Sequence, residues 1–112
     1  MISLDLSCIA APMVNQSDLP FRILVRRYNA SLVYTQMLLP DRLLNDQEYL
    51  EFHRRGLRDA QDTPVVVQLC GNDPEIAVAA SRTVVDRADA IGACICIADS
   101  ENPDRGFEDI QT

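Results

Sequence analysis

The sequence predicts an α/β fold in which short buried strands alternate with amphipathic helices, and three observations favour this class. Residues 64–69 read PVVVQL, a continuous valine run typical of a parallel strand that is buried on both faces. Two stretches, 17–28 and 73–84, combine a capping residue, an early proline and apolar side chains at helical spacing. Further apolar runs of strand length lie at 8–13, 31–37 and 89–97.

The first strand and helix follow from the N-terminal quarter of the chain. Residues 8–13 are apolar and too short for a helix, so they predict a buried strand in which Cys8 is a reduced core thiol. Ser17 or Asp18 can cap the next helix, with Pro20 in its first turn. The apolar positions of this helix predict a stripe that faces the core: Phe21, Leu24, Val25 and Tyr28.

The middle of the chain predicts a strand and a helical surface segment. Residues 31–37 (SLVYTQM) are rich in β-branched and aromatic side chains, which suit a strand. Residues 41–60 place their leucines and aromatics irregularly among charges. We therefore expect one or two helical pieces there, which Gly56 interrupts.

The last third predicts a helix, a strand and a tail. Asp73 can cap a helix that has Pro74 at its first position. Residues 89–97 (DAIGACICI) predict a fourth strand, after which the composition turns polar and acidic. We expect a folded unit over residues 1–98 and a divergent tail over residues 99–112.

Alternating strands and helices favour parallel strands joined by right-handed crossovers. Two architectures satisfy this order, a doubly wound sheet and part of a (β/α)8 barrel. A full barrel needs about 250 residues, so these 112 residues supply at most about its first half.

Charge limits the partners that the chain can bind by itself. Acidic residues outnumber basic ones by 17 to 10, and the net charge of −7 disfavours nucleic-acid binding by this chain alone. The basic residues are all arginines, and two groups of them lie on expected helices: Arg22, Arg26 and Arg27, and Arg54, Arg55 and Arg58. Asp18 stands four residues before Arg22. Glu51 has the same spacing to Arg55, so we interpret both groups as solvated helix faces.

Metal binding, histidine chemistry and membrane insertion find little support in the sequence. The four cysteines form no C-x-x-C pair, so we expect no metal site. The single histidine, His53, lies in a charged segment and predicts a solvated side chain. No apolar run approaches the roughly 18 residues of a membrane span, and the N-terminus lacks the positive start of a secretory signal. We expect an intracellular protein of the cytoplasm or nucleus.

Four motifs in combination resemble the N-terminal part of the tRNA-dihydrouridine synthase family, especially its eukaryotic branch. They are APMVNQSDLPFR (11–22), LVYTQM (32–37), PVVVQLCGNDPE (64–75) and DAI (89–91). Members of the family are FMN-dependent, NADPH-using enzymes that reduce uridine in tRNA, on a (β/α)8 barrel followed by a helical RNA-binding domain. The resemblance covers about residues 9–91 and implies the N-terminal half of such a barrel.

The resemblance also implies a cofactor site. Pro12, Met13 and Val14 would form the floor beneath the flavin, with backbone groups near its ring, and Gln68 would reach the polar edge of the ring. The residue types suit these roles, since Met13 is polarizable and Gln68 offers both a donor and an acceptor. Without the motifs, Met13 would be interpreted as core packing and Gln68 as satisfying a backbone group.

The sequence departs from the family after DAI, where the family continues into D-L-N-x-G-C-P with a cysteine as general acid. Aligned residue on residue, that cysteine falls at Ile97, which cannot donate a proton. Cys96 lies one position away, on the opposite face of a strand. We therefore assign no catalytic residue, and we expect a truncated family member, inactive alone.

Three hypotheses follow for the function. The first is a tRNA-dihydrouridine synthase that uses FMN and NADPH. The second is another flavin barrel, such as a dihydroorotate dehydrogenase or an ene-reductase. The third is a non-enzymatic fragment that binds a partner chain by strand addition or helix docking. Half a barrel leaves strand edges unpaired, so we also expect self-association through these edges.

Overall fold

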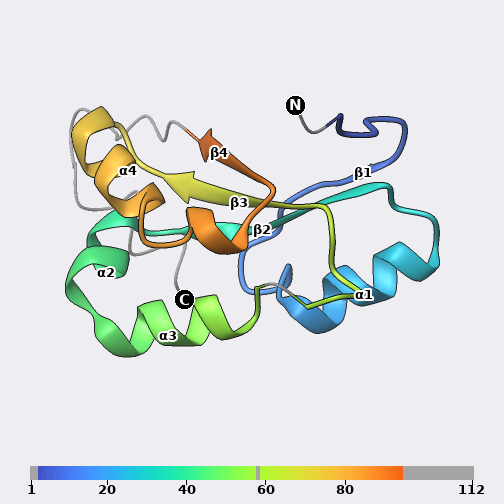
Figure 1. Ribbon diagram of the computed structural model, residues 1–112, viewed down its shortest axis with the longest axis horizontal. Coiled ribbons are helices and arrows are strands. Elements are labelled where there is room, and N and C mark those ends of the chain that lie inside the picture. Colours follow the sequence, from blue (N-terminus) through green and yellow to red (C-terminus); the bar gives the residue numbers. More distant parts are fainter. Residues whose placement is uncertain (1–2, 58, 95–112) are drawn as a thin grey trace.

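The computed structural model describes residues 3–57 and 59–94, which form a parallel sheet with helices between its strands (Figure 1). In chain order the elements are β1 (Ile9–Ala10), α1 (Leu19–Arg27), β2 (Leu32–Leu38), α2 (Pro40–Asn45), α3 (Gln47–Arg55), β3 (Val65–Cys70), α4 (Pro74–Ser81), a short 3-10 helix (Val85–Arg87) and β4 (Ala90–Cys94). The expected boundary at residue 98, the tail at 99–112, Cys96 and Ile97 lie outside the described residues.

The strands lie in the sheet in the order of the chain, β1-β2-β3-β4, and every neighbouring pair is parallel. A doubly wound sheet reverses its strand order at a switch point, whereas a barrel keeps it. The α/β prediction is therefore confirmed, and the strand order is that of the N-terminal half of a (β/α)8 barrel.

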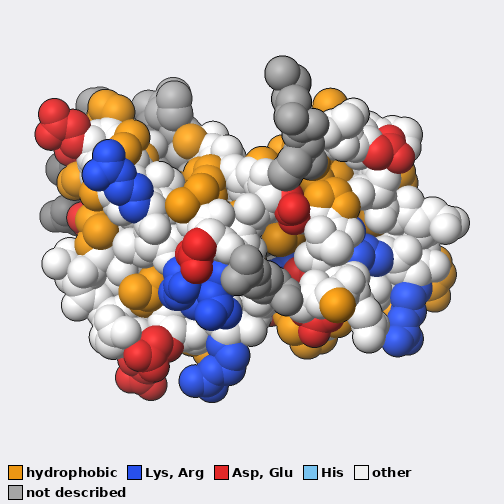
Figure 2. All heavy atoms as spheres, in the orientation of Figure 1, with side chains coloured by type: hydrophobic (Ala, Val, Ile, Leu, Met, Phe, Trp, Pro, Cys, Tyr) orange, Lys and Arg blue, Asp and Glu red, His pale blue; other side chains and the backbone are white. Residues whose placement is uncertain are grey.

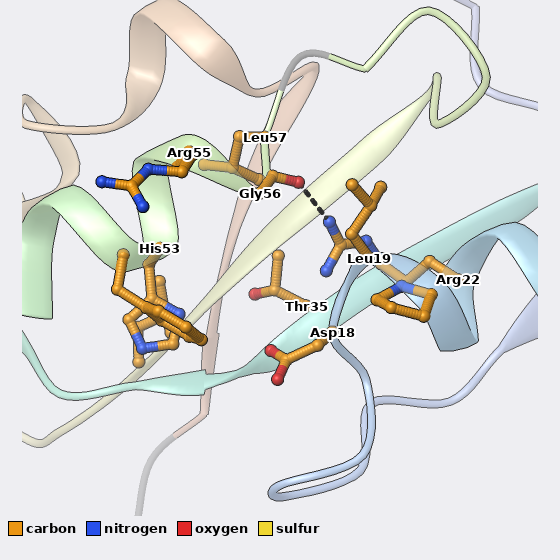
Figure 3. Close-up of a pocket in the computed structure, with 11 residues that line it drawn as sticks. Asp18, Leu19, Arg22, Thr35, His53, Arg55, Gly56 and Leu57 are labelled. Carbon is orange, nitrogen blue, oxygen red and sulfur yellow. Dashed lines mark hydrogen bonds between the residues drawn. The ribbon is translucent and has the colours of Figure 1, made fainter.

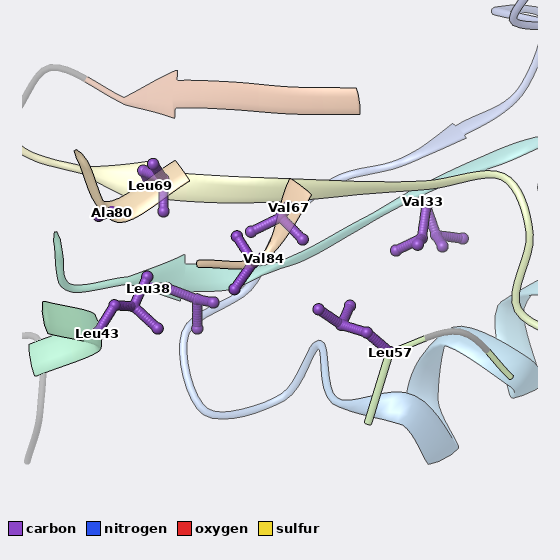
Figure 4. Packing of buried hydrophobic residues seen from close by; sticks show 9 residues of the cluster. Val33, Leu38, Leu43, Leu57, Val67, Leu69, Ala80 and Val84 are labelled. Carbon is purple, nitrogen blue, oxygen red and sulfur yellow. The ribbon is translucent and has the colours of Figure 1, made fainter. Parts of the chain in front are cut away.

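The hydrophobic core lies between the helices and one face of the sheet (Figure 4). Alternate residues of β3 point into it, and α2 and α4 supply facing side chains, while α1 and α3 pack at its margin through partly buried residues. The buried cluster comprises Val33, Leu38, Leu43, Leu57, Val65, Val67, Leu69, Ala80 and Val84. Burial of these aliphatic side chains fixes the helix layer on this face.

Two expected helix boundaries are confirmed by capping. The Asp73 carboxylate accepts hydrogen bonds from the backbone N–H groups of Glu75 and Ile76, at 2.9 and 3.2 Å, and begins α4. Gly56 is the C-cap of α3, as its interruption of the charged segment predicted. None of the helices in the described part of the chain is long and apolar enough to cross a membrane.

The expected apolar stripe of α1 is partly wrong. Leu24 and Tyr28 are 49% and 78% exposed, whereas Arg22 is 3% exposed. The buried side of α1 accommodates this arginine because a carboxylate from another segment neutralises it. Cys8 also differs from expectation, since it is exposed: β1 contains only Ile9 and Ala10, and so the strand begins after it.

The interpretation as a solvated helix face is wrong for Arg22 and Arg26, because both bind the buried carboxylate of Asp62 in an ionic cluster, whereas Arg27 and Arg55 are exposed as expected. Asp62 is 1% exposed, and its two carboxylate oxygens bind Arg22 Nε at 2.8 Å and Arg26 Nη2 at 3.0 Å. The expected pairs at four-residue spacing do not form, because Asp18 instead accepts from Gln36 and Glu51 from Gln47. A buried carboxylate is a stronger partner than a solvated one, since little water screens it.

Arg22 links three segments. Besides Asp62 it donates to the carbonyl oxygens of Ser17 and Gly56, at 2.8 and 2.7 Å, and Figure 3 shows its reach from α1 toward Gly56. It therefore joins the loop after β1, the end of α3 and the loop before β3.

Candidate functional site

Two of the hollows near the carboxyl end of β2 are lined in part by Phe52 and His53 of α3. The larger, about 420 Å³, lies between α1 and α3 on the helix side of the sheet and has a mostly apolar lining (Figure 3). The smaller, about 350 Å³, lies at the carboxyl edge and is lined by Val14, Asn15, Asp18, Gln36, Met37, Leu39, Arg42, Tyr49, Phe52 and His53. Barrels bind ligands at the carboxyl ends of their strands, so we place the candidate site at this edge.

The loop after β1 contains three of the sequence-predicted residues, Pro12, Met13 and Val14. The backbone N–H of Met13 donates to Ser17 Oγ at 2.8 Å, and its carbonyl accepts from the N–H groups of Gln16 and Ser17. Because these backbone groups are already bonded within the loop, Met13 presents its side chain, which is 37% exposed. Val14 lines the smaller hollow.

Gln68 lies on the neighbouring strand of the same edge. In the sheet register it stands opposite Met37 of β2, which also lines the smaller hollow, and opposite Gly92 of β4. The structure therefore places Gln68 one strand away from the hollow that Val14 lines.

The side chain of Gln68 contains an acceptor that lacks a partner. Its Oε1 atom is buried and has no hydrogen-bond partner among the described residues. An unmet buried polar group costs about 1–3 kcal/mol. A ligand with an N–H group at this edge would remove that cost.

His53 is a site residue that sequence reasoning missed. Its side chain is half-buried and lines both hollows, against the expectation of a solvated residue. Burial lowers the pKa of His53 below its usual 6.5, although the Asp18 carboxylate opposes that effect. The ring packs edge-on against Tyr49, four residues earlier, with 4.4 Å between centroids. The four-residue spacing of Tyr49 and His53 places both side chains on one face of a helix, and this spacing was the signal in the sequence from which their contact could be predicted.

The charged side chains that line the smaller hollow are Arg42 of α2 and Asp18, the N-cap of α1. The Arg42 guanidinium lies 4.2 Å from the centre of the Tyr49 ring, and it also pairs with Asp46 at 2.9 Å. Within residues 3–57 and 59–94, no three His, Cys, Asp or Glu side chains gather in a way that could hold a metal ion. The smaller hollow therefore combines apolar and polar groups from the loop after β1, the end of β2 and the helices α2 and α3.

Comparison with known proteins agrees with the motifs. The model of the dihydrouridine synthase (Dus) family matches residues 9–94. The tRNA-dihydrouridine(16/17) synthase [NAD(P)(+)] of Saccharomyces cerevisiae is 46% identical over 84 residues, which is 74% of this chain and 20% of that protein.

Other relatives show a similar level of identity. The rat protein named tRNA-dihydrouridine(16/17) synthase [NAD(P)(+)]-like is 41% identical over 83 residues, covering 74% of this chain and 19% of its own. The tRNA-dihydrouridine synthase B of Pseudomonas aeruginosa is 41% identical over 78 residues, covering 68% and 23%. The chain thus spans about a fifth of the length of these relatives. Since the family model matches most of its 112 residues, the chain belongs to the dihydrouridine synthase family.

Proposed function

We propose that this chain supplies the first half of the catalytic barrel of a tRNA-dihydrouridine synthase. This enzyme reduces uridine in tRNA to dihydrouridine with FMN as cofactor and NADPH as reductant. The observation that supports the proposal most directly concerns Gln68 at the carboxyl edge. Its Oε1 atom is buried and has no hydrogen-bond partner among the described residues. The names of the relatives support tRNA as the substrate and a nicotinamide reductant. The choice of FMN as the cofactor rests on the family resemblance and on how well the residues at the carboxyl edge suit a flavin ring.

The residues at the edge suit a flavin. The flavin edge shows N–H and carbonyl groups, so Gln68 Oε1 would accept a hydrogen bond from a ring N–H. The exposed Met13 side chain and Val14 would lie beneath the ring, with Pro12 at the start of the loop. When bound, FMN supplies the hydride that reduces the uracil ring.

The chain alone does not provide the proton for this reduction. The family resemblance places the general acid at Ile97, outside the described residues, and a hydrocarbon side chain cannot donate a proton. We therefore propose no catalytic residue here, and we expect the 112-residue chain to be inactive by itself.

We propose that tRNA is bound mainly by other parts of a full-length enzyme, in the cytoplasm or nucleus. The net charge of −7 opposes a phosphate backbone. On the face seen in Figure 2, arginines lie beside Asp and Glu rather than in one basic patch.

In the described sheet β1 and β4 are the outer strands, and we propose that two copies associate through these edges.

Cofactor binding can be tested on the full 112-residue chain. FMN is added, unbound flavin is removed by gel filtration, and the absorbance of the protein peak is recorded. Retained flavin with a shifted band supports the proposal, and the variant Gln68→Met is then expected to bind at least about tenfold more weakly. The matched control is Gln61→Met, since Gln61 is exposed and lies in the loop before β3, at the amino end of that strand. A protein peak without flavin supports the non-enzymatic alternative instead.

Activity can be tested in a chimera. Residues 9–94 replace the matching segment of the yeast tRNA-dihydrouridine(16/17) synthase, in a strain that lacks the native enzyme. We expect dihydrouridine in tRNA to be restored. A second chimera that extends the replacement through residue 98 introduces Ile97 and should lose activity while it still binds FMN. A folded first chimera without dihydrouridine contradicts the proposed function.

A further inference from the structure

β2 contains a bulge at the candidate site. Tyr34 pairs with Val66 and Met37 with Gln68, and the register shifts between these pairs. Two residues of β2, Thr35 and Gln36, thus stand where β3 has only one. Bulges of this kind redirect side chains and often occur beside functional sites.

The two bulge residues bind different neighbours. Thr35 Oγ1 accepts from the backbone N–H of Gln68 at 3.1 Å and donates to the carbonyl of Gln36 at 2.8 Å, so it substitutes for a ladder acceptor. The side chain of Gln36 extends instead to the loop after β1. Its Oε1 accepts from the N–H of Asn15 at 2.9 Å, and its Nε2 donates to Asp18 Oδ1 at 3.0 Å.

The loop needs such a contact. Asn15 has a φ of 59°, in the left-handed region that asparagine tolerates better than most residues but that still costs energy. Asp18 is the N-cap of α1, yet its side chain makes no capping hydrogen bond, because Gln36 engages the carboxylate. A single amide therefore matches a donor at one end of the turn and an acceptor at the other, which neither a carboxylate nor an apolar side chain can do.

We infer that Gln36 is the positioning residue for the cofactor floor. Its amide holds the 13–18 loop at the carboxyl edge, and the loop in turn presents Met13 and Val14. The opposite side of the loop is held separately, through Ser17, whose carbonyl accepts from Arg22. The role toward a cofactor rests on the proposed function, whereas the hold on the loop does not.

The chemistry of the contact allows a reciprocal exchange of donors and acceptors. In Gln36→Glu the new carboxylate faces the Asp18 carboxylate, so like charges push the loop away. In Asp18→Asn an oxygen remains to accept from Gln36, and little should change. In the double variant the amide introduced at position 18 can donate to the carboxylate introduced at position 36, so the contact is rebuilt with reversed polarity.

The first readout is hydrogen exchange of the Asn15 amide, followed by NMR on the full chain without cofactor. We expect exchange about tenfold faster in Gln36→Glu, and within about twofold of the parent in the double variant. The matched control is Gln16→Glu, which adds the same charge to the same loop at an exposed side chain and should leave Asn15 unchanged.

The second readout is the FMN dissociation constant, which should rise about tenfold in Gln36→Glu and recover in the double variant. A parent chain that binds no FMN contradicts the proposed function, while the Asn15 exchange still tests Gln36. Unchanged exchange in Gln36→Glu, or no recovery in the double variant, overturns the inference. If Gln36→Glu fails to fold, a folded double variant with a protected Asn15 supports the inference, and an unfolded one overturns it.

Discussion

Gln68 combines a stability defect with a candidate binding role. Its Oε1 is buried without a partner among the described residues, so the folded chain bears a desolvation cost that a ligand would remove. Binding sites often keep such groups at the expense of stability.

The residue-scale prediction for Gln68 separates stability from binding. Gln68→Met removes the unmet acceptor and keeps the length of the side chain, so the free energy of unfolding should rise by about 1 kcal/mol. Urea denaturation monitored by circular dichroism measures this change. Gln61→Met, at an exposed position, should alter stability little. A Gln68→Met chain that is clearly less stable would show that the amide is satisfied in solution.

His53 predicts a pH dependence of stability. Burial holds the pKa of His53 in the folded chain below the 6.5 expected when it is unfolded. Between these two pKa values the unfolded chain therefore binds more protons at His53 than the folded chain does. The contribution of His53 to the free energy of unfolding is consequently greatest above about pH 6.5 and declines as the pH falls through the folded pKa. Because this is the only histidine, His53→Gln should flatten the decline in urea denaturation series between about pH 7 and 5. An NMR titration midpoint of His53 above 6.5 would refute this.

At the scale of elements, the Asp62 cluster joins helices to the sheet. Asp62 lies in the loop that leads into β3, and both arginines that it binds come from α1. Arg26 also donates to the carbonyl oxygens of Thr63 and Pro64. The cluster thus fixes the position of α1 against the start of β3.

Removal of the carboxylate charge should loosen this connection. Asp62→Asn leaves the buried Arg22 without its counter-charge, and the free energy of unfolding should fall by about 3 kcal/mol. Thermal and urea denaturation measure the loss. The control is Asp86→Asn, which breaks an ion pair with Arg54 whose carboxylate is 52% exposed and should change stability little. Equal losses in the two variants would mean that the buried cluster contributes nothing special.

At the scale of the whole molecule, the outer strands of the sheet are the feature to test. β1 is short and lies at one edge, and its Ile9 is 46% exposed. Exposed strand edges promote pairing between chains, and a lysine on the edge opposes it.

Self-association should therefore respond to charge at the edge. We expect Ile9→Lys to shift the chain toward monomer in sedimentation velocity runs across a dilution series. Leu24→Lys, at a position 49% exposed on α1, places the same charge away from the strand edge and should leave the distribution unchanged. A monomeric parent chain, or equal effects of the two substitutions, would contradict association through β1.

The order of strands and helices, the caps at Asp73 and Gly56, and the family were predictable from the sequence, because these depend on local hydrogen bonding and on short motifs. The sequence also placed Gln68 at a strand end, since the valine run before it defines β3. It did not indicate that the oxygen of this side chain would lack a partner among the described residues.

Which polar groups are buried, and what they bind, became apparent from the folded arrangement of the chain. Asp62 neutralises Arg22 across 40 residues of sequence, and Gln36 reaches Asn15 across 21. Neither of these sequence separations follows from the repeat of a helix or a strand, because such pairs form where the folded chain brings distant segments together. Periodicity predicts which side chains face a core, but the burial of a charge depends on a partner that only the assembled fold supplies.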